Sequence, residues 1–213
     1  MDFGSFSLCN AEGPIFVDRG RGSYNSDKEG IYGFSAESHN TTLINGLPLV
    51  PNCRGGWFAY RKCLNIDQKV SSRERSDERQ ITWGTRSVER FGKSLKWNRD
   101  ITLRLNHFEI IETLYNPMHI NVEIKTYFHL ASGWEVDFDQ HDNILFLRKA
   151  AQKYRFMFER SSGPFTIELY NGRAGEIGGW HFPDYGTKVP AITLGLSFQS
   201  AESYRARFFL CQI

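Results

Sequence analysis

The sequence predicts an all-β protein, a large antiparallel two-sheet β-sandwich in which residues 1–213 form one domain. Apolar and polar residues alternate with a period of two in many segments, as expected for strands with one buried and one exposed face. Short turn sequences separate these segments, and no segment carries an apolar stripe at helical spacing. Such strands favour antiparallel pairing, and burial of one face of each requires a second sheet.

The first two clear strands lie in the middle of the chain. Residues 101–106 alternate, and Leu105 is expected on their apolar face. The clearest alternation is in residues 119–130, where the apolar side chains at positions 120, 122, 124, 128 and 130 share one face. His119 and His129 belong to the opposite, polar face. We therefore expect both histidines to be exposed on a sheet.

Three further strands are predicted towards the C-terminus, at residues 165–170, 192–198 and 204–210. The charge-dense stretch at residues 69–79 contains both signs, which is typical of a solvated loop or hairpin. Residues with strong turn preferences separate the predicted strands. These turn sequences are Asn116-Pro117, Ser132-Gly133, Asp142-Asn143, Ser162-Gly163-Pro164 and Asn171-Gly172.

Composition excludes several classes of partner. The 26 basic and 24 acidic side chains give a net charge of +2, so nothing favours nucleic acid as a partner. No apolar run approaches the roughly 18 residues that a membrane span needs. None of the four cysteines forms a C-x-x-C pair, which argues against a thiolate zinc site. A disulfide between Cys53 and Cys63 and buried free thiols both remain open.

Two polar residues stand out in the glycine-rich first third. Asp18 ends an apolar strand and is followed by Gly20, and His39 precedes a predicted strand. Loops of this kind often carry the functional groups of a β scaffold. From the residues alone, Asp18 also fits a cap or turn residue, and His39 also fits a hydrogen-bonded structural histidine.

Several short motifs together resemble one known family, the heparinase II/III-like family, in its C-terminal β-sandwich domain. The HNT sequence followed by a strand and a glycine turn is the most specific of them. The matching segments are residues 3–8, Val17-Asp18-x-Gly20, Tyr24, Tyr32, Ser35, His39-Asn40-Thr41 and the late segment 179–186. The resemblance therefore covers most of the chain.

The resemblance implies β-elimination of an acidic, uronate-containing polysaccharide. Complete members pair an N-terminal α/α toroid with this sandwich, the substrate lies between the two, and the toroid carries most of the catalytic groups. No catalytic residue can therefore be assigned within this chain, and whether it is an enzyme stays open. By the same resemblance the chain is expected to be a fragment that is inactive alone. The bacterial periplasm or cell envelope is the family's usual location.

The resemblance also implies a zinc site. In family members with zinc, the second histidine of an H-x-H-x-D element, a later aspartate and the HNT histidine hold the metal. Asp2 matches the aspartate of that element, which places both histidines upstream of Met1. Asp18 and His39 match the other two ligands, so the chain retains two of three. Histidine nitrogen and carboxylate oxygen are suitable zinc donors.

Tyr24 and Tyr32 are the candidate substrate contacts, because both lie in the glycine-rich loops near the expected metal ligands. The alternative is that both pack over the edge of the sandwich. Phe34 departs from the family pattern, since relatives often carry an arginine there. Two other functions remain open: a non-catalytic carbohydrate-binding module, and a structural sandwich that docks onto a helical domain.

Overall fold

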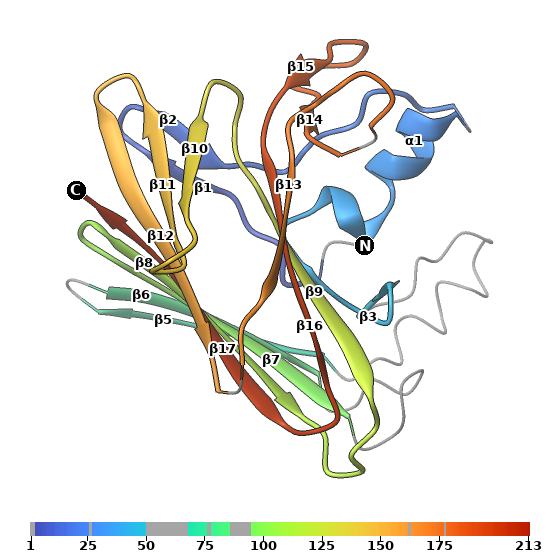
Figure 1. The fold of residues 1–213 in the computed structure, drawn as a ribbon, viewed down its shortest axis with the longest axis vertical. Helices are drawn as coiled ribbons and strands as arrows, with labels where there is room; N and C mark the ends of the chain where they lie inside the picture. The colour runs from blue at the N-terminus through green and yellow to red at the C-terminus, as the bar shows by residue number, and fades with distance from the viewer. Residues whose placement is uncertain are drawn as a thin grey trace. The chain divides into compact units, whose positions relative to one another are not determined.

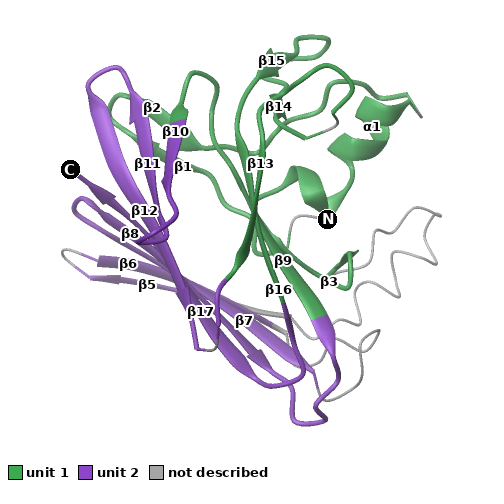
Figure 2. Ribbon diagram, in the orientation of Figure 1, with its two compact units in different colours: residues 1–52, 123–135, 165–198 green, residues 53–122, 136–164, 199–213 purple. Residues whose placement is uncertain are grey.

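The computed structural model describes residues 3–25, 27–49, 68–75, 78–85, 95–161, 163–176 and 178–213. Most of its elements are labelled in Figure 1. Within these residues no helix is both long and apolar enough to span a membrane. The chain separates into two compact units, coloured in Figure 2. The first unit contains the described residues within 1–52, 123–135 and 165–198. The second unit contains those within 53–122, 136–164 and 199–213.

The first unit contains a five-stranded antiparallel sheet with the strand order β13-β16-β9-β3-β4. Two small two-stranded sheets, β1-β2 and β14-β15, and the short helices α1 and η1 accompany it. The elements are β1 (Leu8–Asn10), β2 (Gly13–Phe16), α1 (Lys28–Gly33), η1 (Ala36–Ser38), β3 (Thr42–Ile44), β4 (Leu47–Pro48), β9 (Val122–His129), β13 (Thr166–Tyr170), β14 (Trp180–His181), β15 (Val189–Pro190) and β16 (Thr193–Ser200).

The core of the first unit lies where β2, β3, β9 and β16 come together. Phe16 and Phe128 are fully buried and lie with ring centroids 5.7 Å apart. Phe6 contacts both rings edge-on. β16, which lies between β13 and β9, is buried over residues 193–198, so side chains on both of its faces are covered. This core fixes the ends of β2 and β3, where the candidate site residues lie.

The second unit is an eight-stranded antiparallel sheet with the strand order β10-β11-β12-β17-β8-β7-β6-β5. Alternation is clearest in β17, whose apolar residues at positions 204, 206, 208 and 210 are buried. The strands are β5 (Gln68–Arg75), β6 (Glu78–Thr85), β7 (Lys96–Arg104), β8 (His107–Tyr115), β10 (Glu135–Asp139), β11 (Ile144–Lys149), β12 (Gln152–Arg160) and β17 (Tyr204–Gln212).

The predicted all-β class and the two large antiparallel sheets are confirmed. The charge-dense stretch pairs as the antiparallel strands β5 and β6, so the hairpin prediction is also right. Several predicted turns carry the expected left-handed backbone, with φ of 83° at Gly133, 53° at Asn143 and 69° at Gly172. A side chain at Gly172 would meet the Gly179 carbonyl oxygen at 2.3 Å, which explains the need for glycine.

Three details of the strand predictions are wrong. Leu105 is 90% exposed because β7 ends at Arg104 and the chain turns there. His119 is exposed as predicted, but it lies before β9 rather than on a strand, with φ of 50°, because the Asn116 side chain bonds both backbone groups of Ile120 and forms a turn. His129 is fully buried rather than exposed, for a reason described below.

The cysteine predictions are settled only in part. Cys9 is exposed and Cys211 is half-buried, and both are free thiols. Cys9, which lies on the exposed side of β1, is therefore not a buried thiol. Cys53 and Cys63, and the Asp2 that the family resemblance singled out, lie outside the described residues.

Candidate functional site

Asp18 and His39 meet in the first unit. Asp18 lies just after β2, and His39 lies between η1 and β3. The Nδ1 of His39 is 2.5 Å from Oδ2 of Asp18, and the Gly20 amide donates to the other carboxylate oxygen at 3.1 Å. Burial would raise the pKa of Asp18, but the hydrogen bond and charge of His39 outweigh it and hold this pKa below its usual value. The two residues thus form a charge-assisted pair.

The loop that carries Asp18 has a close backbone approach. The amide of Phe182 donates to the Arg19 carbonyl at 2.8 Å. A Cβ at Gly20, where φ is 71°, would lie 2.2 Å from the Phe182 carbonyl oxygen. Gly22 faces the Phe182 ring just as closely. Glycine at these two positions lets the loop run against Phe182, which fixes where Asp18 sits.

The asparagine of the HNT motif is a structural anchor. Asn40 is fully buried, and its Nδ2 donates to the carbonyl oxygens of Phe6 at 2.8 Å and Val17 at 2.9 Å. Its Oδ1 accepts from the His129 amide at 2.7 Å. One side chain therefore satisfies three backbone groups from three different segments. This is why the residue after His39 is an asparagine, which supplies donors and an acceptor together.

A buried arginine and histidine lie behind this pair. Arg19 Nε donates to Nδ1 of His129 at 2.7 Å, and both side chains are fully buried. Because a guanidinium can only donate, Nδ1 must accept, which leaves the ring proton on Nε2. That nitrogen is 3.2 Å from the His39 carbonyl oxygen. The buried contact with Arg19 explains why His129 is not exposed.

Both of these buried groups have shifted pKa values. Burial lowers the pKa of Arg19 to about 10. Burial, and then the positive charge of Arg19, lower the pKa of His129 well below its usual value. His129 is therefore neutral when the protein is folded. The two terminal nitrogens of Arg19 are buried and find no hydrogen-bond partner among the described residues.

Acidification should destabilise the protein through His129. The folded state resists protonation of this ring, while the unfolded state takes up a proton as the pH falls through about 6.5. Between pH 7.5 and 5.5 we expect this residue to remove about 1 kcal/mol from the free energy of unfolding. Urea denaturation of the wild type and of His129→Asn at both pH values measures the effect. An equal loss of stability in the two proteins would show that another group is responsible.

The two candidate substrate contacts lie in different surroundings. Tyr24 is 69% exposed and stacks on Tyr185, with the Arg21 guanidinium 4.0 Å from its ring centroid. Tyr32 is buried, and its hydroxyl donates to the Glu37 carbonyl at 3.3 Å. Burial raises the pKa of Tyr32 to about 12. Phe34, the departure from the family pattern, lies under the same Arg21, 3.3 Å from its ring centroid.

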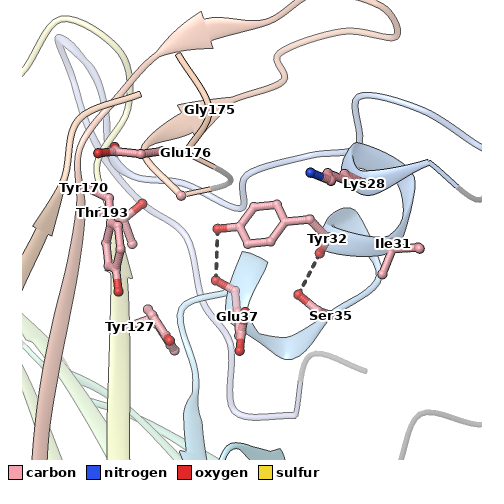
Figure 3. A pocket seen from close by; sticks show the side chains of 11 residues that line it. Lys28, Ile31, Tyr32, Ser35, Glu37, Tyr127, Tyr170, Gly175, Glu176 and Thr193 are labelled. Carbon is pink, nitrogen blue, oxygen red and sulfur yellow. Dashed lines mark hydrogen bonds between the residues drawn. The ribbon is translucent and has the colours of Figure 1, made fainter. Parts of the chain in front are cut away.

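Tyr32 lines a cavity of about 580 Å³ that the sequence did not reveal. This volume is in the range of small-molecule sites. Figure 3 shows Tyr32 facing Tyr170 and Thr193 across it. Neither Tyr24 nor the Asp18–His39 pair lines it. The lining residues are Lys28, Ile31, Tyr32, Ser35, Glu37, Tyr127, Tyr170, Gly175, Glu176, Gly178 and Thr193.

Asp18 and His39 fit a zinc site only in part. Their donor types are suitable, but the described residues contain no group of three histidine, cysteine, aspartate or glutamate side chains that could hold a metal. The two donor atoms also bond to each other directly, and a zinc ion held by both would replace that hydrogen bond. The described residues alone therefore do not make a zinc site.

Comparison with solved structures supports the fold. The Heparinase III-BT4657 gene product matches with a TM-score of 0.73 at 11% identity, over 100% of this chain and 30% of that chain. Heparan sulfate lyase HepC from Pedobacter heparinus matches with a TM-score of 0.72 at 11% identity, over 99% and 30%. A search of curated proteins found no match. The chain thus spans about 30% of the length of the structures that it resembles.

The two large antiparallel sheets and the motif around Asp18 and His39 define an all-β domain with a polar pair beside β2 and β3. The family model "Heparinase II/III-like, C-terminal" matches residues 1–207. The chain belongs to this family. The resemblance found in the sequence is therefore confirmed, while the roles of Asp18, His39, Tyr24 and Tyr32 stay predictions.

Proposed function

We propose that the chain is the β-sandwich part of a polysaccharide lyase that cleaves an acidic, uronate-containing polysaccharide by β-elimination. The family match over residues 1–207 is the observation that carries this proposal. The names of the similar structures, heparinase III and heparan sulfate lyase, support it. Because the chain spans about 30% of those structures, the activity belongs to a longer protein in this proposal.

The reaction needs more groups than this chain supplies. A base removes the proton next to the uronate carboxylate, the electron pair forms a C=C bond, and the glycosidic C–O bond breaks as its oxygen is protonated. A further group neutralises the carboxylate in the transition state. By the family resemblance an α/α toroid would contribute most of these groups, and Asp18 and His39 of this chain would hold a metal rather than transfer protons. We therefore expect the chain alone to be inactive.

Reading the coding sequence upstream of Met1 and expressing the longer protein tests this proposal. The longer protein should release unsaturated uronate products, detected by their ultraviolet absorbance, from uronate polysaccharides, while residues 1–213 alone should release none. His39→Ala in the longer protein should lower the rate by about tenfold or more, because it removes the partner of Asp18 and a predicted metal ligand. Sugar binding without any elimination product would instead favour a carbohydrate-binding module.

Zinc binding is a separate proposal. Asp18 and His39 would supply two donors, and a third would come from outside the described residues. We expect the purified chain to hold less than one equivalent of zinc, and Asp18→Ala and His39→Ala to reduce that content to background. His141→Ala is the matched control, because His141 forms a similar but exposed pair with Asp142 at 2.7 Å. The assignment fails if the site variants hold as much zinc as the parent.

A further inference from the structure

Three tyrosines line the cavity beside α1. Tyr32 comes from α1, Tyr127 from β9 and Tyr170 from β13. Burial raises the pKa values of all three, so each is a neutral phenol at physiological pH. Aromatic faces of this kind stack against the apolar faces of sugar rings.

The hydrogen-bonding groups of the cavity include an unsatisfied acceptor. The Oε2 atom of Glu176 is buried and has no hydrogen-bond partner among the described residues. Its backbone carbonyl is held by the Trp180 indole at 3.0 Å, which fixes the segment that carries it. Figure 3 shows Glu176 on the same side of the cavity as Tyr170, opposite Tyr32. Oε2 has almost no accessible surface, so a ligand in the cavity that donates a hydrogen bond to this carboxylate would have to reach the other oxygen, Oε1.

The charges of the cavity disfavour an anionic ligand. Two carboxylate side chains, Glu37 and Glu176, line it, against one cation, Lys28. Lys125 lies close by but is already paired, with its Nζ 2.8 Å from Glu168 Oε2, and the Tyr170 hydroxyl bonds to the same carboxylate. A uronate carboxylate placed here would face two like charges and find one free amine.

We propose that this cavity binds an uncharged sugar residue, which stacks on the tyrosines and donates a hydroxyl group to Glu176. The site is separate from the Asp18–His39 pair, which does not line it. Under the function proposed above, it would hold a neutral residue of the polysaccharide rather than the uronate that reacts. The binding itself needs no elimination chemistry, so it can be tested on this chain alone.

Isothermal titration calorimetry of residues 1–213 tests the assignment with defined trisaccharides. The neutral probes are cellotriose, maltotriose and fully N-acetylated chitotriose, and the anionic probe is trigalacturonate. At least one neutral probe should bind, and trigalacturonate should bind at least about tenfold more weakly, because its carboxylates would face the carboxylates of Glu37 and Glu176. Absence of binding by every neutral probe, or equal binding of trigalacturonate, would overturn the proposal.

Two variants identify the site. Glu176→Gln keeps the shape of the side chain and removes its charge, and should weaken neutral binding about tenfold. Tyr170→Phe should weaken it less, because the ring face is kept. Glu202→Gln and Tyr115→Phe, at exposed positions of the second unit, are the matched controls and should bind as the wild type does. An unchanged affinity in Glu176→Gln would place the sugar elsewhere.

The test also separates this site from the lyase proposal. Asp18→Asn should retain full binding of the neutral trisaccharide, because Asp18 does not line the cavity. In the longer protein the same variant should lose elimination activity. If the longer protein shows no elimination activity, the binding of the neutral trisaccharide still stands. If the chain binds no neutral trisaccharide, the elimination assay still tests the lyase proposal.

Discussion

Replacing Asn40 with aspartate should lower the free energy of unfolding by about 3–5 kcal/mol. The side chain is fully buried, and its amide nitrogen donates to the carbonyl oxygens of Phe6 and Val17. Aspartate would lose both donors and turn a carboxylate oxygen towards those two carbonyls. Both carbonyls would then lose the amide donor of Asn40 and face a buried charge instead. Urea denaturation followed by tryptophan fluorescence measures the change.

The same substitution at Asn45 provides a matched control. Asn45 is exposed, and it uses only its Oδ1, which accepts from the Glu123 amide at 2.8 Å. Aspartate keeps that acceptor and tolerates the left-handed backbone at this position, where φ is 50°. We expect Asn45→Asp to change the stability by less than about 0.5 kcal/mol. Equal effects at the two positions would show that the bonds of Asn40 do not stabilise the fold as argued.

The second large effect is expected in the eight-stranded sheet. Arg99 on β7 lies directly opposite Glu112 on β8, and the two side chains are 0% and 1% exposed. Arg99 Nε donates to Glu112 Oε1 at 2.8 Å. Glu112→Ala would leave a buried guanidinium without its counter-charge, which should lower the free energy of unfolding by about 3–5 kcal/mol. Urea denaturation again measures the change.

Two comparisons identify the cause of that effect. Glu78→Ala removes a pair with Arg104 that is also cross-strand but partly exposed, and it should cost less than about 1 kcal/mol. The double variant Arg99→Met with Glu112→Leu removes both charges and should recover most of the lost stability. If the double variant is as unstable as Glu112→Ala, lost packing rather than the unpaired charge is the cause.

The same buried charges explain why part of the fold could not be read from the sequence. The period of two identified β17, in which apolar residues alone are buried. It did not identify β8, because Glu109 and Glu112 are buried there among apolar neighbours. Both carboxylates are paired, with Arg207 and Arg99 respectively. Such pairing is set by neighbouring strands, so a pattern within one segment cannot show it.

The candidate site was predictable to the same limited degree. The motifs around Asp18 and His39 brought the right two residues together. Arg19 and His129 were missed, because an arginine in a glycine-rich loop and a histidine on the polar side of a strand both indicate exposure. Their contact joins residues 110 positions apart. The tyrosine cavity was missed for a similar reason, since its walls come from α1, β9, β13 and their connecting segments.

The setting of His39 has a consequence for protein engineering. Its backbone is held on both sides, by the Ala36 carbonyl at 3.1 Å and the Thr41 amide at 2.8 Å, and the next residue, Asn40, is locked by its own side chain. The scaffold therefore places position 39 without help from the imidazole. Directed evolution could therefore introduce other functional side chains at position 39 without changing the surrounding backbone. Position 40, in contrast, should tolerate almost no substitution.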